Sequence, residues 1–396
     1  METFRAIIRG DLPPVGQPIV TGKTSPQPIV IPGYHASWLD SGTSALALAL
    51  LLARAENPIS APEVIVPAYG CPDIVAACIY AGCTAKLVDI RSCAWGYDLD
   101  QLRQALSPNT LAVIGVNFLG IREDWPGILE VLKTWDAPVN TIEDNAQWFP
   151  DDTAAETFYS DQIIFSFGKG KPVSLLGGGA LFSRTPCSIT DAIQAKTVPP
   201  ALVLKTQYAI FNQLLRPSIY WFLNHNPIFK PGATAYHPLK AIRGMDDLRL
   251  SLLPNNYHRY AHRTDVIAAA IYATLCDLGM SDNLYAQLNT LNRKMLRFPL
   301  LCNNNEQRDT LLNALNSQGL GATAMYQKAL ADLDCPAALI DARQAQNNAR
   351  DFACRLLTLP CHSGVTHQHF AKITDTLTTH LRSDADANQL FFETLT

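Results

Sequence analysis

Charged residues are sparse in this chain of 396 residues, and neither sign of charge dominates. They make up 17% of the sequence, and 31 Lys and Arg stand against 35 Asp and Glu, for a formal net charge of −4. There is no stripe of basic residues of the kind that a nucleic-acid-binding surface needs. Nor is there an internal repeat. The apolar content of 48% is instead typical of a globular, enzyme-sized protein.

Long apolar runs and paired cysteines are also missing. The longest apolar run, residues 45–53, is too short to span a bilayer. Residues 1–16 lack the apolar core of a signal peptide. The ten cysteines include no CxxC pair, which argues against a structural zinc site. In a chain of this size we expect mostly buried free thiols in a reducing compartment. We therefore expect a cytoplasmic protein with no metal site, no membrane span and no nucleic-acid partner.

Strand-like and helix-like segments alternate from residue 40 onwards, after an irregular arm rich in Pro and Gly. Val- and Ile-rich strands separated by helices predict βαβ units and a largely parallel sheet flanked by helices, which is an α/β fold. The predicted strands are residues 63–69, 85–90, 110–118 and 137–144, and the predicted helices are residues 40–54, 73–82, 99–107 and 125–135. In such sheets ligands bind beyond the carboxyl ends of the strands.

The chain is too long for one ordinary core, so two domains are expected. We expect a large α/β domain at residues 1–245, including the irregular N-terminal arm, and a smaller C-terminal α/β domain at residues 246–396. Between them, residues 201–229 are apolar and aromatic. We expect a buried helix or a subunit interface here. A membrane-surface patch is less well supported, because the segment has little basic flank.

Two stretches carry polar residues at positions suited to ligand binding. Residues 41–44, Ser-Gly-Thr-Ser, open the first predicted helix and could bind a phosphate, although taken alone they indicate an ordinary N-cap. Residues 142–147, IEDNAQ, end a predicted strand, so that Glu143 and Asp144 point to opposite faces. One of them could enter a cleft, and a solvated carboxylate is equally expected. In a cleft, an Asp could keep a heterocyclic nitrogen protonated, which a pyridinium electron sink requires.

The loop FSFGKGKPVSLLGGG, residues 165–179, places Lys169 and Lys171 before a glycine cluster. A lysine amine in an enclosed loop becomes nucleophilic and suits a Schiff base. The alternative is a flexible surface loop with two solvated lysines. The helix start, the Asp after a strand and this loop occur in that order, however. Together they supply the phosphate cradle, the pyridinium partner and the lysine of a pyridoxal phosphate (PLP) site.

Five motifs occur in an order that resembles a known family. They are SGTSALALAL, IEDNAQ and DQIIFSFGKGK, followed near the C-terminus by AMYQKAL and LLTLPCHSGVT. They are similar to the SGT-x-AL, EDxAQ, FSFxxxK, xHYxPL and LxLPxHxGLT motifs of the DegT/StrS family of PLP-dependent sugar aminotransferases. That family belongs to fold type I. The resemblance covers nearly the whole chain from residue 40, and the ED-x-AQ and SF-x-x-x-K pair is its most specific part.

The resemblance assigns a role to each candidate residue. Lys171, five residues after Ser166, would form the Schiff base, and Lys169 would have no role. Asp144 would face the pyridine nitrogen and Gln147 the ring. The phosphate would be held by Ser166, Thr43 and the backbone of Ser44.

Three departures from the family pattern stand out. Cys71, or its neighbour Tyr69, occupies the place of an aromatic residue that covers the cofactor ring. Gly178 stands where the family has an acidic residue. The family's Asn-x-Arg-Met segment, which contacts the partner subunit's phosphate, is poorly matched near residues 242–247, where only Met245 aligns.

The resemblance implies a homodimeric PLP-dependent aminotransferase. It would move an amino group from glutamate or glutamine to a nucleotide-linked keto-sugar, for a surface polysaccharide or a glycosylated metabolite. One alternative is a PLP enzyme with a non-sugar acceptor that uses the aromatic segment around residues 220–222. Another is a non-catalytic regulatory or scaffolding member of the family. The presence of Lys171 argues against the dehydratase branch, in which His replaces that lysine.

Overall fold

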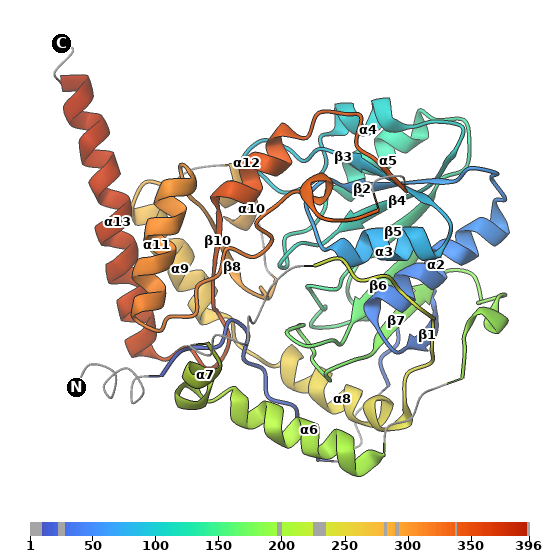
Figure 1. Ribbon diagram of the computed structural model, residues 1–396, viewed down its shortest axis with the longest axis horizontal. Coiled ribbons are helices and arrows are strands. Elements are labelled where there is room, and N and C mark those ends of the chain that lie inside the picture. The colour runs from blue at the N-terminus through green and yellow to red at the C-terminus, as the bar shows by residue number, and fades with distance from the viewer. Residues whose placement is uncertain are drawn as a thin grey trace.

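The computed structural model describes residues 10–22, 28–195, 200–224, 235–280, 283–289, 293–336 and 339–393. Figure 1 shows the large sheet on one side of the molecule, helices α9, α11 and α13 on the other, and helices α6 and α8 along the lower margin. Residues 10–22 and 28–34 form neither helix nor strand, as expected of the arm.

The large sheet has eight strands in the order β1-β7-β6-β5-β4-β2-β3-β9. Strands β6, β5, β4, β2, β3 and β9 run parallel to one another. Strand β7 is antiparallel to both β6 and β1. The strand bounds are β1 His35–Leu39, β2 Glu63–Pro67, β3 Thr84–Val88, β4 Thr110–Val116, β5 Asn140–Asp144, β6 Gln162–Ser166, β7 Gly179–Ser183 and β9 Ile340–Asp341. The expected mostly parallel α/β sheet is confirmed.

Helices connect the parallel strands at the positions predicted from the sequence. They are α2 Gly42–Glu56, α3 Pro72–Tyr80, α4 Leu99–Ala105 and α5 Trp125–Lys133. Polar caps fix where three of them begin, because Ser41, Asp98 and Asp124 each accept a hydrogen bond from a first-turn N–H group. Helix α2 consists mainly of Ala and Leu and packs against β6, β7 and α3, so ten of its 15 residues are buried.

The C-terminal part contains a second, two-stranded antiparallel sheet of β8 Phe298–Leu301 and β10 Leu356–Leu359. The helices of the chain beyond β7 are α6 Ala201–Leu214, α7 Pro217–Asn224, α8 Asp247–Ala261, α9 Val266–Asp277, α10 Asn283–Asn289, α11 Asn305–Ser317, α12 Asn347–Arg355 and α13 His367–Glu393, with short 3-10 turns at Thr190–Ala192 and Leu330–Asp332. Strand β9, from this part of the chain, pairs with β3 at the edge of the large sheet.

Buried polar side chains hold the N-terminal arm against the C-terminal part. Arg297 donates to the carbonyls of Pro14, Gly321 and Thr358 and to the Thr358 hydroxyl. His362 Nε2 lies 2.9 Å from the Pro13 carbonyl. Burial lowers the pKa of Arg297 to about 10 and that of His362 to about 4. The arm thereby lies beside the loop that carries the candidate lysine.

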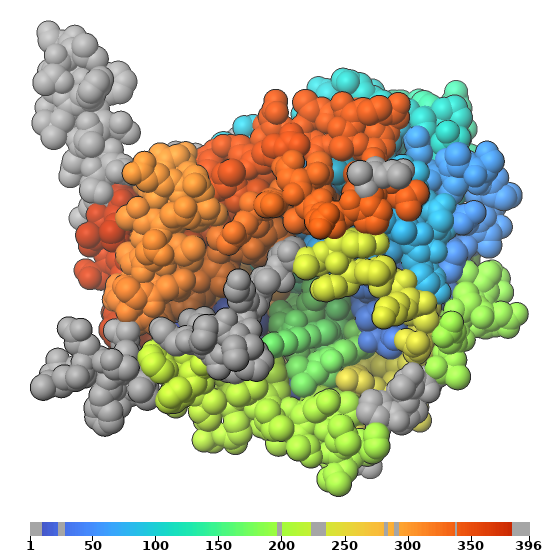
Figure 2. All heavy atoms as spheres, viewed as in Figure 1, coloured from blue at the N-terminus to red at the C-terminus, as the bar shows by residue number. Residues whose placement is uncertain are grey.

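Helix α6 differs from the expectation of a buried helix. Only Leu204 and Tyr208 are buried along its length, whereas Leu202 is 76% and Ile210 54% exposed. The expectation of a buried helix is therefore wrong for the single chain, because α6 lies on the surface of the molecule instead of between other elements (Figure 2). The alternative expectation, a subunit interface, stays a prediction.

Candidate active site

One cavity lies at the carboxyl ends of β4, β5 and β6, where the start of α2 meets the 165–179 loop. Six of the seven residues predicted from the sequence line it: Thr43, Cys71, Asp144, Gln147, Ser166 and Lys171. Its other lining residues are Gly42, Leu46, Gly70, Asp73, Ile74, Val116, Phe118, Ala146 and Ile164. Segments that are up to 130 residues apart in the sequence thus meet in one place, as a parallel sheet requires of its carboxyl ends.

The start of α2 forms one wall of the cavity. Ser44, the seventh predicted residue, does not line it, because its N–H donates to Ser41 Oγ at 3.0 Å and its hydroxyl donates to Asp40 at 2.6 Å. Thr43 and Ser166 do line the cavity. Gly42 allows the helix to approach the end of β6, since a Cβ atom on Gly42 would lie 2.7 Å from Ser166 Cβ. A helix N-terminus with two hydroxyls beside it suits an anion.

Two acidic residues line the cavity, and Asp144 is the buried one, whereas Asp73 is exposed. Asp144 ends β5, is 5% exposed and accepts a hydrogen bond from the Ala146 N–H at 2.8 Å. Burial raises the pKa of Asp144, while that hydrogen bond and the charge of Lys171 lower it. Glu143 points to the opposite face, where burial raises its pKa to about 7 against the opposing charges of Arg122 and Arg293. The alternation of a strand therefore separates the two carboxylates.

Gln147 is fixed at both ends of its amide. Its Oε1 accepts a hydrogen bond from the Leu119 N–H at 3.0 Å, and its Nε2 donates to the Tyr326 hydroxyl at 2.9 Å. Tyr326 is itself buried. Sequence reasoning did not assign Tyr326 to the site, although it recognised the segment AMYQKAL in which Tyr326 lies. The two hydrogen bonds hold the Gln147 side chain in one orientation on the cavity wall.

Cys71, not Tyr69, lines the cavity. Tyr69 is fully buried, donates to the Tyr326 carbonyl and packs edge-on against Phe118 and Phe352. Burial raises the pKa of the Cys71 thiol to about 11, and the charge of Lys171 lowers it. Cys71 is therefore a neutral thiol near neutral pH, presenting a small apolar surface to the cavity.

The two lysines of the loop have different surroundings. Lys171 is half-buried and lines the cavity, whereas Lys169 is exposed and is absent from the cavity wall. Gly178, behind them, has a φ of +102°, and a Cβ atom there would lie 2.8 Å from the terminal methyl of Met245. An acidic residue at this position would need a backbone conformation that L residues rarely adopt, and the Met245 side chain would have to move.

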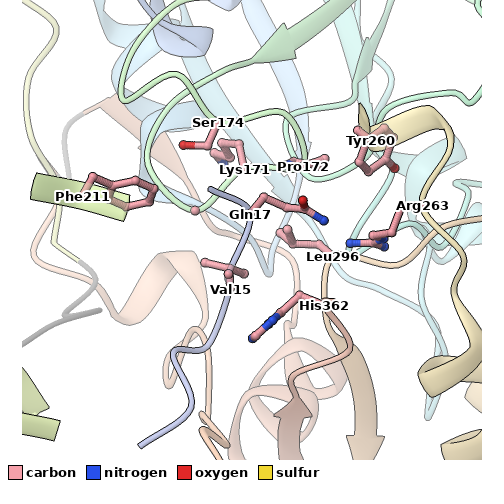
Figure 3. A pocket seen from close by; sticks show the side chains of 12 residues that line it. Val15, Gln17, Lys171, Pro172, Ser174, Phe211, Tyr260, Arg263, Leu296 and His362 are labelled. Carbon is pink, nitrogen blue, oxygen red and sulfur yellow. The ribbon is translucent and has the colours of Figure 1, made fainter. Parts of the chain in front are cut away.

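Lys171 also lines a second, smaller pocket, shown in Figure 3. The residues across it come from the arm, from α6, from the end of α8 and from the turn after β10; they include Gln17, Phe211, Tyr260, Arg263 and His362. Lys171 therefore lies between the cavity beside Asp144 and this pocket. None of the residues 220–222 lines either one.

No cluster of three or more His, Cys, Asp or Glu side chains suited to a metal ion occurs among the residues that the structure describes. Within the same residues, no helix is both long enough and apolar enough to cross a membrane.

A curated relative matches part of the chain. It is UDP-N-acetyl-3-dehydro-alpha-D-glucosamine 3-aminotransferase of Acidithiobacillus ferrooxidans, which is 31% identical over 149 residues. The match spans 37% of this chain and 39% of that relative.

Solved structures share the fold at low sequence identity. A protein of Streptococcus pneumoniae described as a sugar aminotransferase, in its PMP form, superposes with a TM-score of 0.63 at 19% identity, covering 89% of this chain and 88% of that one. S. venezuelae DesV in complex with a ketimine intermediate gives 0.61 at 19% identity, covering 88% and 85%. E. coli GDP-4-keto-6-deoxy-D-mannose-3-dehydratase with bound hydrated PLP gives 0.62 at 15%, covering 87% of each. The expected fold type I is confirmed.

The sequence model of one family matches most of the chain, in two parts. It covers residues 33–197 and 254–378, which include all seven predicted site residues, and leaves residues 198–253 unmatched. The chain belongs to the DegT/DnrJ/EryC1/StrS aminotransferase family.

Proposed function

We propose that the protein is a PLP-dependent aminotransferase that uses Lys171. The observation that carries the proposal is that Lys171 and the buried carboxylate of Asp144 line one cavity together with Thr43 and Ser166. Family membership supports the same reaction class. An amine, a carboxylate and a hydroxyl-lined helix start are the three groups that PLP requires of a protein.

The cavity residues fit the cofactor group by group. Thr43 and Ser166, beside the positive end of α2, would hold the phosphate, and Gly42 keeps the space between them free of a side chain. Asp144 would accept the hydrogen of the pyridine nitrogen. Gln147 would lie against the ring, and Cys71 would supply an apolar contact. When bound, PLP withdraws electrons from the carbon that carries the amino group, so that a proton can leave or return there.

Lys171 has two tasks in this proposal. Its amine would hold the cofactor through the aldehyde carbon in the resting enzyme. Once an amino donor has displaced it, Lys171 Nζ would carry a proton from the donor carbon and later return a proton to the acceptor carbon, acting as general base and then as general acid. Lys171 lines both the cavity and the smaller pocket beside it.

Asp144 would keep the ring nitrogen positively charged throughout. Burial raises the pKa of its carboxyl group, and the charge of Lys171 opposes that change. A pyridinium nitrogen in contact with Asp144 would also lower the pKa of the carboxyl group, so that both groups stay ionised. The Ala146 N–H, 2.8 Å from Asp144 Oδ1, fixes the carboxylate in place.

We further propose glutamate or glutamine as the amino donor, which leaves as the corresponding oxo acid, and a nucleotide-linked keto-sugar as the acceptor. The family description and the named activity of the curated relative, a sugar 3-aminotransferase, support a sugar acceptor. A homodimer in the cytoplasm that serves polysaccharide synthesis is part of the same proposal. A non-catalytic member would be expected to lose at least one of Lys171, Asp144 or Gln147, and all three are present.

The test is the visible absorption spectrum of the purified protein with PLP, before and after glutamate. We expect a band of lysine-bound cofactor that glutamate bleaches. Lys171→Ala should not form that band. The exposed Lys169→Ala is the matched control and should behave as the wild type does. A band that persists in Lys171→Ala would mean that another lysine holds the cofactor. Cofactor uptake without any response to glutamate or glutamine would favour the non-catalytic alternative.

A further inference from the structure

Helix α6 exposes large apolar side chains on the side that points away from the rest of the molecule. Its buried stripe consists of Leu204 and Tyr208. At 100° per residue, Val203 and Ile210 lie on the opposite side of the helix, where they are 44% and 54% exposed, and Leu202 beside them is 76% exposed.

Helix α7 follows α6 after two residues and packs against it. It contributes Phe222, which is 56% exposed and packs edge-on against Trp221. We call the exposed residues Leu202, Val203, Ile210 and Phe222 the α6–α7 face. Figures 1 and 2 show α6 and α7 at the lower margin of the molecule.

The segment that carries the α6–α7 face contains no acidic residue. Between Asp191 and Asp246 the sequence has no Asp or Glu, although the whole chain has a net charge of −4. Six basic residues are spread along this longer segment rather than clustered at either flank of residues 201–229: Lys196, Lys205, Arg216, Lys230, Lys240 and Arg243. Of those that the structure describes, Lys205, Arg216 and Lys240 are exposed. The charged residues of this segment are thus all basic.

This segment coincides with the part of the chain that departs from the family. The family model leaves residues 198–253 unmatched, and α6 and α7 lie wholly within that range. The described residues of the candidate active site all lie outside it, apart from Phe211 at the smaller pocket beside Lys171. The surface therefore belongs to this chain rather than to the matched part of the family pattern.

We propose that the α6–α7 face docks the protein onto an anionic lipid surface. Exposed Leu, Val, Ile and Phe side chains would enter the boundary between headgroups and acyl chains, and the basic residues would lie among the phosphates. An isologous contact with a second copy fits less well. It would bring two acid-free, positively charged segments together with no carboxylate from either to pair with them.

Docking would also place the candidate active site near the lipid surface. Phe211, on α6, and Lys171 line the same small pocket (Figure 3). The binding itself does not rest on transaminase activity, so vesicle binding and turnover can fail independently of each other.

The test is co-sedimentation of the full chain with vesicles. We expect binding to vesicles that contain phosphatidylglycerol, release at high salt, and little binding to pure phosphatidylcholine. The double variant Val203→Glu/Ile210→Glu should bind at least about tenfold more weakly, because apolar burial is replaced by charges that anionic lipid repels. Lys205→Glu/Arg216→Glu should weaken binding to the anionic vesicles only.

Val266→Glu is the matched control, since Val266 is 65% exposed on α9 and lies outside the face. It should bind as the wild type does, and circular dichroism should show that every variant is folded. Failure of the wild type to bind anionic vesicles would overturn the proposal. So would equal binding by Val203→Glu/Ile210→Glu. Dissociation of a lipid-free oligomer by that variant, seen in sedimentation velocity without any vesicle binding, would assign the face to self-association instead.

Discussion

The Gln147 side-chain amide donates a hydrogen bond to the Tyr326 hydroxyl, 2.9 Å away, across 179 positions of sequence. Gln147 lines the candidate cofactor cavity, and Tyr326 belongs to the C-terminal part of the chain. Tyr326 in turn accepts a hydrogen bond from Tyr69 through its backbone carbonyl. The C-terminal part therefore helps to set the orientation of a residue on the cavity wall.

Removal of the Tyr326 hydroxyl should destabilise the protein. Tyr326→Phe leaves the buried Gln147 amide without this acceptor, which is expected to cost about 1–3 kcal/mol of unfolding free energy and to weaken PLP binding. Urea denaturation and cofactor titration measure the two effects. Tyr257→Phe is the control, because its more exposed hydroxyl donates to the Asp151 carbonyl and does not contact the cavity residues. Equal losses in both variants would contradict a specific role for Tyr326.

His362 should make stability depend on pH. Burial lowers its pKa from 6.5 to about 4. Between those values the unfolded chain binds a proton that the folded chain does not, so folding stability is lost as the pH falls from about 6.5 towards 4. Burial raises the pKa values of Glu123 and Glu143 to about 7. These two groups therefore increase folding stability as the pH falls over part of the same range, which opposes the effect of His362. The contribution of His362 must therefore be measured as a difference between variants.

His362→Gln is the variant that isolates this contribution. It can still donate to the Pro13 carbonyl but does not titrate. Relative to the variant, the wild type should lose about 2 kcal/mol of unfolding free energy between about pH 6.5 and about pH 5. Urea denaturation at the two pH values gives the difference. Parallel pH profiles for the two proteins would mean that His362 does not stay neutral in the folded state.

The sequence predicted the sheet and the cavity because both depend on local patterns. Alternating strands and helices, together with polar residues after strands, locate the carboxyl ends of a parallel sheet. The resemblance to the family, through its spacing from Ser166, favoured Lys171 over Lys169, and the structure has Lys171 on the cavity wall and Lys169 exposed. The chemistry of Lys171 stays a prediction. The resemblance assigned the backbone of Ser44 to the phosphate, whereas in the structure its N–H donates to Ser41 Oγ in the helix cap.

The hydrogen bond between Gln147 and Tyr326 and the exposure of α6 could not be predicted, because both depend on contacts between residues distant in sequence. The pairing of Gln147 with Tyr326 brings together two segments whose motifs were each recognised but not related to one another. The exposure of α6 depends on what packs against it. An apolar helix has the same composition whether it is buried in its own chain or covered by a partner, so the sequence left both open, and α6 is exposed in the single chain.

Asp144 and Glu143 should differ sharply in their effect on activity, although they are neighbours. Asp144→Asn removes the carboxylate from the cavity and should lower transamination by about a hundredfold or more. Glu143→Gln changes the opposite face of β5 and should leave the activity of the folded enzyme within a few-fold of wild type. Single-turnover kinetics with glutamate compare the two. Equal losses of activity would show that Asp144 has no special part in the reaction.

Gly42→Ala tests the place proposed for the phosphate. The backbone of Gly42 is helical and accepts alanine, but the new Cβ atom would lie 2.7 Å from Ser166 Cβ and 2.9 Å from its hydroxyl oxygen. One of the two segments must move, which separates Thr43 from Ser166. We expect PLP to bind at least about tenfold more weakly, measured by fluorescence titration. Gly22→Ala, with no atom within 4 Å of the new methyl, should bind normally. Unchanged affinity in Gly42→Ala would place the phosphate elsewhere.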